Sequence, residues 1–155
     1  MSRAIRRCSV LAGVALCAVL VGPTAVAQAS DNTIRATLNS YSSKIVKDEN
    51  AVKNGLVGYP QGKVKPLVRA LTREVSDLHS LKRQLSQETA SSATGRRGKA
   101  DVIEGLGLIA NAYGALKRDV QAAHGGPVPP SQVAAAVNTD KKGRSKLLAG
   151  LKLLS

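Results

Sequence analysis

The sequence predicts an all-α fold, and the simplest architecture for it is an antiparallel four-helix bundle. Apolar residues recur at alternating steps of three and four residues in four segments, which is the spacing of one helix face. No segment shows the sustained alternation of apolar and polar residues that a half-buried strand requires. The connections between the segments are short, and helices that each bury one face and are joined by short loops pack antiparallel.

The first helical segment follows the predicted start of the mature chain. Its apolar positions are Ile34, Leu38, Tyr41, Ile45, Val52 and Leu56. Asp48 occupies a step where this stripe expects an apolar residue. Asp31 or Asn32 can cap the start of the helix, and the pattern ends at Asn54-Gly55. The next residues, Gly58-Tyr59-Pro60-Gln61-Gly62, are typical of a turn.

The second segment begins near Pro66, which is tolerated in a first helical turn because the missing N–H has no helical partner there. Its apolar positions are Leu67, Leu71, Val75, Leu78, Leu81 and Leu85. Glu74 stands at a step where the stripe expects an apolar residue. The small, polar and basic stretch from Ala90 to Gly98 is interpreted as a loop.

The third segment keeps its spacing without a gap and is unusually rich in small residues. Its apolar positions are Val102, Leu106, Ile109, Tyr113, Leu116 and Val120. The small residues between them are Gly105, Gly107, Ala110, Ala112, Gly114 and Ala115. Because each glycine costs about 1 kcal/mol relative to Ala inside a helix, we expect a compensating close approach of a neighbouring helix. His124-Gly125-Gly126-Pro127 ends the segment.

The fourth segment opens at Pro129-Pro130-Ser131. Its apolar positions are Val133, Val137, Leu147, Leu148, Leu151 and Leu154. The stripe lapses from Asn138 to Ser145, so the segment is either one helix or two shorter ones, with Thr139 or Asp140 capping the second.

Residues 1–29 are interpreted as a cleaved secretory signal peptide. A basic start, Met1 to Arg7, precedes an apolar run from Val10 to Val21. Pro23 breaks that run, and Ala27-Gln28-Ala29 offers small residues at the two positions that a signal peptidase reads. The apolar run is about a dozen residues, well short of the roughly 20 that a membrane-spanning helix needs.

Two other export signals fit the sequence less well. A lipoprotein signal requires a small residue directly before its cysteine, whereas Leu16 precedes Cys17. The Arg6-Arg7 pair is shared with twin-arginine signals, but Cys8-Ser9-Val10 lacks the usual context, so we favour ordinary secretion.

The mature chain, residues 30–155, is then expected to be a single basic, cysteine-free domain. Both cysteines of the sequence, Cys8 and Cys17, leave with the signal peptide, so the fold must rely on its hydrophobic core. The signal carries three arginines and no acid, which lowers the net charge from +13 to about +10. Trp and Phe are absent, so this core must be largely aliphatic.

The sequence carries no recognisable catalytic, metal or cofactor motif, and we expect neither an enzyme nor a metal or cofactor site. His79 and His124 are the two histidines, and neither follows a glutamate by three residues as in di-iron bundles. Glu74 and Asp48 are the candidates for an acid–base role, because burial would raise the pKa of either carboxyl. We expect them instead at the edge of the stripe, paired with a nearby base such as Lys44, Arg69 or Arg73.

Positive charge is the most informative remaining feature. Lys65, Arg69 and Arg73 follow at steps of four along the second segment. A second group, Arg96, Arg97 and Lys99, crowds the next connection, and a third comprises Lys141, Lys142, Arg144 and Lys146. Rows of cations attract polyanions.

We therefore expect contact with an anionic cell-wall polymer or with anionic lipid headgroups, through Lys65, Arg69 and Arg73 together with Arg96, Arg97 and Lys99. A nucleic acid is not the expected partner, because three tyrosines provide a poor stacking surface for bases. The end of the chain, residues 145–154, is similar to a cationic amphipathic peptide, and a terminal helix docked on the bundle is the alternative.

Two further functions stay open from the sequence. One is a protein-interaction or self-associating module that uses the small-residue surface around Gly107 and Gly114. The other is a secreted enzyme that uses Glu74 or Asp48 on a substrate that cannot be named.

The signal region is rich in Ala, Val and Arg, and the mature chain in Ala, Gly, Val and Lys. In composition the chain resembles small exported proteins of high-GC Gram-positive (actinobacterial) bacteria. This resemblance implies a secreted or wall-associated location and carries over no activity and no site residues.

Overall fold

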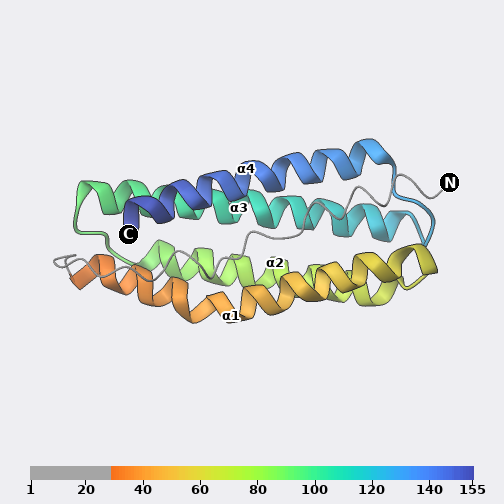
Figure 1. Cartoon of the computed structure of the whole chain (residues 1–155), viewed down its shortest axis with the longest axis horizontal. Helices are drawn as coiled ribbons and strands as arrows, with labels where there is room; N and C mark the ends of the chain where they lie inside the picture. Colours follow the sequence, from red (N-terminus) through yellow and green to blue (C-terminus); the bar gives the residue numbers. More distant parts are fainter. Residues whose placement is uncertain (1–28) are drawn as a thin grey trace.

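The computed structural model describes residues 29–155, with side chains from Asn32 onward, as four helices joined by short connections (Figure 1). The long helices are α1 (Ala29–Gly58), α2 (Val64–Gln87), α3 (Ala93–Ala122) and α4 (Pro130–Leu154). A short 3-10 helix, η3 (Tyr59–Gln61), joins α1 to α2, and Gly62 follows it with a φ of 78°. The predicted signal peptide lies almost wholly in residues 1–28, outside the described residues.

Successive helices run antiparallel, which confirms the predicted bundle. α1 and α2 lie together on one side of the molecule, and α3 and α4 on the other (Figure 1). Close backbone contacts join α1 to α2, α2 to α3 and, most extensively, α3 to α4. The pair α1 and α4 is not among the helices in close backbone contact. Side chains bridge the seam between these two helices. One example is the Arg35 guanidinium, which donates a hydrogen bond to the Ser155 carbonyl (2.8 Å).

The core follows the predicted stripes and is mainly aliphatic. Its most buried side chains are Ile34, Leu67, Leu71, Leu78, Leu81, Leu85, Leu106, Val102 and Val120. Two tyrosines join them: Tyr113 from α3, and Tyr59 from η3, whose hydroxyl donates to the Gly126 carbonyl. No helix of the described residues is long and apolar enough to cross a membrane.

The bounds of α1 differ from the prediction at both ends. α1 does not end at Asn54-Gly55 but continues to Gly58. Gly55 lets α2 approach, since a Cβ there would lie 2.8 Å from Leu67 Cα. The start of α1 also differs, because the helix begins at Ala29 and Asp31 and Asn32 therefore lie inside it and not at the N-cap position.

The stretch from Ala90 to Gly98 is not a loop throughout. α3 begins at Ala93, and the Ser92 hydroxyl caps it by accepting a hydrogen bond from the Gly95 N–H (2.7 Å). The polar composition of this stretch therefore reflects a helix start with an N-cap serine. As a consequence, Arg96, Arg97 and Lys99 lie on a helix and not in a loop.

The fourth segment is one continuous helix. The lapse in its apolar stripe is filled by Asp140 and Gly143, which are both buried. Asp140 does not cap a second helix: its carboxylate lies in the core and pairs with Arg144 of the next turn (2.9 Å). The stripe lapses because two core positions carry a carboxylate and a glycine, not because the helix breaks.

The seam between α3 and α4 is a contact of backbone against backbone, made possible by paired glycines. A Cβ on Gly98 would lie 2.9 Å from the Gly150 carbonyl oxygen, and one on Gly105 would lie 2.7 Å from the Gly143 carbonyl oxygen. Both series have a seven-residue spacing and continue into the buried Ala112 and Ala136. The close approach predicted for the third segment is confirmed, and α4 is the helix that makes it.

Candidate functional site

The structure places the first half of the predicted cationic surface on the outside of α2. Lys65, Arg69 and Arg73 are all exposed, and no other described residue forms an ion pair with them. Eight residues of helix separate the first from the last, so the row extends over roughly 12 Å. We call these three residues the α2 cation row.

The second half of the predicted surface lies elsewhere. Arg96 and Arg97 are exposed near the start of α3, which lies beside the end of α2. Arg73 lies 14 residues before the end of α2, a separation of roughly 21 Å along the axis. Lys99 is part-buried and donates hydrogen bonds to the Ser86 carbonyl (3.4 Å) and the Glu88 carbonyl. It therefore serves the end of α2, and the six predicted residues do not form one patch.

The third cationic group is also divided by the fold. Arg144 enters the interior, and Lys146 pairs with Asp101 (3.3 Å) and Glu104 (3.0 Å) of α3. Lys141 and Lys142 are exposed. The cluster that is continuous in sequence thus supplies two unpaired exposed cations, one lysine paired with α3 and one part-buried arginine.

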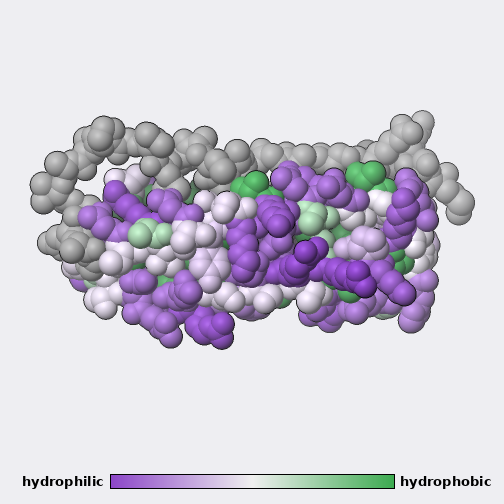
Figure 2. All heavy atoms as spheres, turned by 90° about the horizontal axis from the view of Figure 1, so that it is seen from below, coloured by the Kyte–Doolittle hydropathy of each residue, from purple (hydrophilic) through white to green (hydrophobic). Residues whose placement is uncertain are grey.

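Acidic and basic side chains are segregated between the inside and the outside of the bundle. Among the acidic residues whose side chains the structure describes, Glu104 alone is exposed, and Asp48, Glu74 and Asp140 are buried. Most lysines and arginines point outward, and hydrophilic residues dominate the face seen from below (Figure 2). The outer surface is therefore more positive than the net charge of the sequence indicates.

Two acidic side chains and a tyrosine surround one part-buried arginine. Arg144 donates hydrogen bonds to Asp140 (2.9 Å), to Glu49 of α1 (2.9 Å) and to the Tyr113 hydroxyl of α3 (3.0 Å). Burial by itself would lower the pKa of Arg144, but Tyr113, Glu49 and Asp140 raise it above the usual value. Burial, with Asp140 beside it, raises the pKa of Tyr113. This arginine thus links three helices while keeping its charge.

Glu74 of α2 is the exception in this interior group, because it has no partner. Its side chain is fully buried, and neither carboxyl oxygen forms a hydrogen bond within the protein. Burial, reinforced by the nearby carboxyls of Glu49 and Asp48, raises the pKa of Glu74 to about 8. The expectation of a stripe-edge residue paired with Lys44, Arg69 or Arg73 is therefore wrong for Glu74.

Asp48 is buried as well, at its predicted position in α1, and it adjoins Asp77 of α2. Burial and the Asp77 carboxyl raise the pKa of Asp48. Burial would also raise the pKa of Asp77, but hydrogen bonds from Lys44 and Asp48 lower it. Lys44 thus pairs with Asp77 (2.7 Å) and not with Asp48 or Glu74. We call Asp48, Glu49, Glu74 and Asp140 the interior carboxyl cluster.

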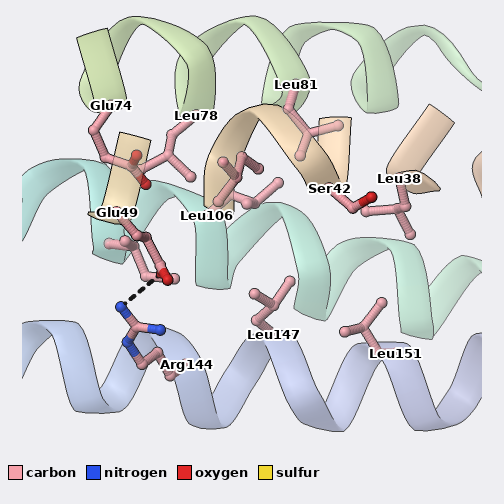
Figure 3. Close-up of a pocket in the computed structure, with 12 residues that line it drawn as sticks. Leu38, Ser42, Glu49, Glu74, Leu78, Leu81, Leu106, Arg144, Leu147 and Leu151 are labelled. Carbon is pink, nitrogen blue, oxygen red and sulfur yellow. Dashed lines mark hydrogen bonds and ion pairs between the residues drawn. The ribbon is translucent and has the colours of Figure 1, made fainter. Parts of the chain in front are cut away.

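A narrow cavity extends from this cluster along the bundle axis (Figure 3). Glu74, Glu49 and Arg144 form its polar end, and the side chains beyond them are aliphatic except for Ser42. The centres of water molecules can occupy about 30 Å³ of it, which is room for one or two waters. All four helices contribute to its wall.

Sequence reasoning found Asp48 and Glu74 but missed Glu49, Asp140 and Arg144 as an interior group. One signal was available: Asp140 and Arg144 stand four residues apart, where opposite charges on a helix pair. Asp140 also continues the spacing of buried positions that includes Gly143 and Leu147. The use of only large apolar residues to define the stripe concealed that spacing.

The histidines and the comparisons with known proteins add no assignment. His79 is exposed on α2, and His124 is exposed just after α3, with a left-handed φ of 46°. Within residues 32–155, no three His, Cys, Asp or Glu side chains are grouped to hold a metal ion.

No protein-family model matches the chain, and no curated protein and no solved structure is similar to it.

Proposed function

We propose that this protein is a non-enzymatic, secreted or wall-associated bundle that binds an anionic surface, such as a wall polymer or lipid headgroups. The observation that carries the proposal is the segregation of charge. The described surface has one exposed acidic side chain, Glu104, against many exposed lysines and arginines. A surface of this kind attracts polyanions and releases their counterions on binding.

The α2 cation row is the preferred contact. Its three side chains are exposed and unpaired, so binding a polyanion breaks no ion pair among the described residues. Arg96 and Arg97 offer a second, separate contact at the other end of α2. An extended polymer can reach both, whereas a small anion can occupy only one.

The proposed contact is with charges and not with the apolar interior of a membrane. Val57 is the exposed large hydrophobic side chain of the described residues, at 72% exposure. The end of α4, which in sequence is similar to a membrane-active peptide, buries Leu147 and Leu154 in the core. The end of the chain is therefore a terminal helix docked on the bundle. Binding to lipid headgroups would accordingly be electrostatic.

The test is binding of the purified protein to isolated wall material, and to vesicles of anionic or of zwitterionic lipid, across a salt series. The variant Lys65→Glu/Arg69→Glu/Arg73→Glu is compared with Lys141→Glu/Lys142→Glu/Lys152→Glu, which has the same change in charge at exposed positions outside the row. We expect binding that falls steeply with salt and is lost in the first variant but largely kept in the second.

Equal loss in the two variants would mean that overall charge, and not the row, governs binding. Absence of binding to every anionic surface at low salt would overturn the proposal. The difference between wall material and anionic vesicles then tells which source of anionic groups the surface prefers.

The alternative function, a protein-interaction module, would use the half-buried positions Gly107 and Gly114 of α3. Gly105 and Ala112 are buried in the α3–α4 side of the bundle. Gly107 lies beside the Lys82 side chain, whose Nζ would be 3.2 Å from an added Cβ, and Gly114 lies beside Arg118. A partner that contacts α3 at Gly107 or Gly114 would therefore also meet these basic side chains.

A further inference from the structure

The positive charge on the outside of α2 extends beyond the three residues of the α2 cation row. Arg83 follows Lys65 by 18 residues, which is about five full turns of an α-helix, so both side chains leave α2 in the same direction. Arg83 is exposed, and no other described residue forms an ion pair with it. The exposed cations therefore extend over roughly 27 Å of this helix. We call Lys65, Arg69, Arg73 and Arg83 the extended α2 row.

No exposed acidic side chain of α2 interrupts the extended α2 row. The two acids of the helix are Glu74, which is buried, and Asp77, which is part-buried and pairs with Lys44. None of the other exposed residues of α2 is acidic: they are Pro66, Thr72, Ser76, His79, Gln84, Ser86 and Gln87. An anionic chain that lies along α2 would therefore meet no exposed carboxylate of that helix.

The spacing of the cations fits a linear phosphodiester. From Lys65 to Arg69, and again from Arg69 to Arg73, the helix rises by roughly 6 Å. Two phosphorus atoms joined through a three-carbon polyol are separated by six bonds, which extend over at most roughly 7 Å, as in two residues of extended polypeptide. Successive phosphates can therefore contact successive cations, and about five phosphates extend from Lys65 to Arg83.

Hydroxyl groups lie beside the cations on the same helix. The Thr72 hydroxyl donates a hydrogen bond to the Val68 carbonyl, and the Ser86 hydroxyl to the Lys82 carbonyl, each at 2.8 Å. The hydroxyl hydrogens are thus used within the helix, whereas Thr72 and Ser86 are exposed and their oxygens can still accept a hydrogen bond. The hydroxyl groups of a polyol are donors of the kind that these oxygens can accept.

The exposed cations form a line and not a broad surface. α1 packs beside α2, and its exposed lysines among the described residues are Lys44 and Lys47. Lys44 already pairs with Asp77. A planar lipid surface resting on α1 and α2 would therefore meet its cations mainly along α2. This arrangement favours a single chain over a membrane as the partner.

We propose that the outer face of α2 binds a linear polyol phosphate lengthwise, with its phosphates at the four cations of the extended α2 row and its hydroxyl groups beside Thr72 and Ser86. This inference rests on the proposed function and narrows it to one class of wall polymer and one orientation. It also adds Arg83 to the contact, roughly 15 Å along the axis from Arg73.

The first experiment measures binding of the purified protein to glycerol phosphate oligomers of two, five and eight phosphates across a salt series. Affinity should rise steeply from two to five phosphates and only slightly from five to eight, because five phosphates already reach from Lys65 to Arg83. For the longer oligomers, log K should fall with log salt concentration with a slope of about −3, since each of four contacts contributes about 0.7. Equal affinity for the oligomers of two and five phosphates would overturn the lengthwise arrangement.

Arg83→Gln tests the far end of the contact. At low salt this variant should bind the oligomer of five phosphates about tenfold more weakly, with a slope shallower by about 0.7, and should bind the oligomer of two phosphates as the unchanged protein does. The matched control is Arg97→Gln, which removes an exposed arginine of α3. Equal losses in the two variants would mean that overall charge governs binding and would contradict the site.

The class of polymer is tested with three other anions: an oligomer of propanediol phosphate, which has the same spacing but no hydroxyl groups, an oligomer of glutamate, and vesicles of anionic lipid. Glycerol phosphate should bind about threefold more tightly than propanediol phosphate, because only the former donates hydrogen bonds to the helix. Equal or tighter binding of any of the three would overturn the polyol phosphate assignment while leaving the proposed function in place. Absence of binding to every anion at low salt would overturn both.

Discussion

Helix α4 packs against its two neighbours, α3 and α1, in different ways. Toward α3, α4 presents Gly143 and Gly150, and at these positions the two backbones come into direct contact. Toward α1, it presents Arg144, Leu147 and Leu151, which leave a cavity and enclose charge. The same helix thus has one side that is close-packed and one side that is held by an ion pair across a gap.

The contrast between the two sides of α4 explains where the bundle accommodates polar groups. Close backbone contact at the paired glycines of α3 and α4 leaves no room there for buried water or for a charged side chain. The wider α1–α4 seam holds Glu49 and Arg144, with Glu74 of α2 behind them. Close backbone packing and the polar cavity therefore lie on different sides of α4.

The largest effect on stability is expected from removing Arg144, which bridges α1 and α4. Arg144→Met leaves Asp140, whose side chain is 3% exposed, and Glu49 without their cation. Removing one partner of a buried ion pair costs about 3–5 kcal/mol of the free energy of unfolding. Denaturant unfolding at neutral pH measures this loss.

The matched control is Lys146→Met, two residues further along α4. Lys146 pairs with Asp101 and Glu104, whose side chains are 20% and 54% exposed, so the loss should stay below about 1 kcal/mol. Similar losses in the two variants would show that the interior charges are not more strongly coupled to folding than those at the surface.

A smaller effect is expected from the titration of Glu74. Its pKa is raised from 4.5 to about 8 on folding, so the folded protein holds a proton that the unfolded chain releases. Stability is then fully present below pH 4.5 and declines as the pH rises through 8. Between pH 5 and pH 9 we expect a fall of about 2–4 kcal/mol in the free energy of unfolding.

Glu74→Gln removes the titrating group and keeps its size, so this variant should lose most of that pH dependence. Denaturant unfolding of both proteins at pH 5, 7 and 9 gives the comparison. A slope that is the same in the two proteins would place the titration in another group and not in Glu74.

The fold class and most of the core could be predicted from the sequence, because large aliphatic residues at helical spacing dominate burial. The prediction failed where small or charged residues occupy core positions. Gly55, Gly98 and Gly143 were taken as stops, loops or gaps, although each allows a neighbouring helix to approach. From the sequence alone, a glycine that ends a helix cannot be distinguished from a glycine that allows two helices to pack closely. The distinction depends on whether a neighbouring helix lies against that glycine.

The candidate sites were predictable only in part for a related reason. Exposure of the α2 cation row follows from the spacing along one helix, so the sequence was sufficient for it. The interior carboxyl cluster draws Glu49 from α1, Glu74 from α2 and Asp140 from α4, and nothing in one helix indicates what the others contribute. Arg144 in particular stood in a run of exposed cations and was grouped with them.

The close packing of α3 against α4 can be tested by adding a single methyl group. Gly105→Ala places a Cβ 2.6 Å from the backbone nitrogen of Leu147, so one helix must move. Overpacking of this kind costs about 1–3 kcal/mol, which outweighs the gain in helix propensity of about 1 kcal/mol. We expect a net loss of about 1–2 kcal/mol by thermal or denaturant unfolding.

The smallest effect, and the one with the opposite sign, is expected two residues away. At Gly107 an added Cβ meets only the Lys82 side chain, with Nζ at 3.2 Å, and this flexible end can move aside. Gly107→Ala should therefore show the gain in helix propensity, about 0.5–1 kcal/mol, without the steric cost. A loss at both positions would mean that α3 tolerates no added volume on either side. A gain at both would mean that the α3–α4 seam is looser than its backbone distances indicate, and the contrast between the two seams of α4 would no longer hold.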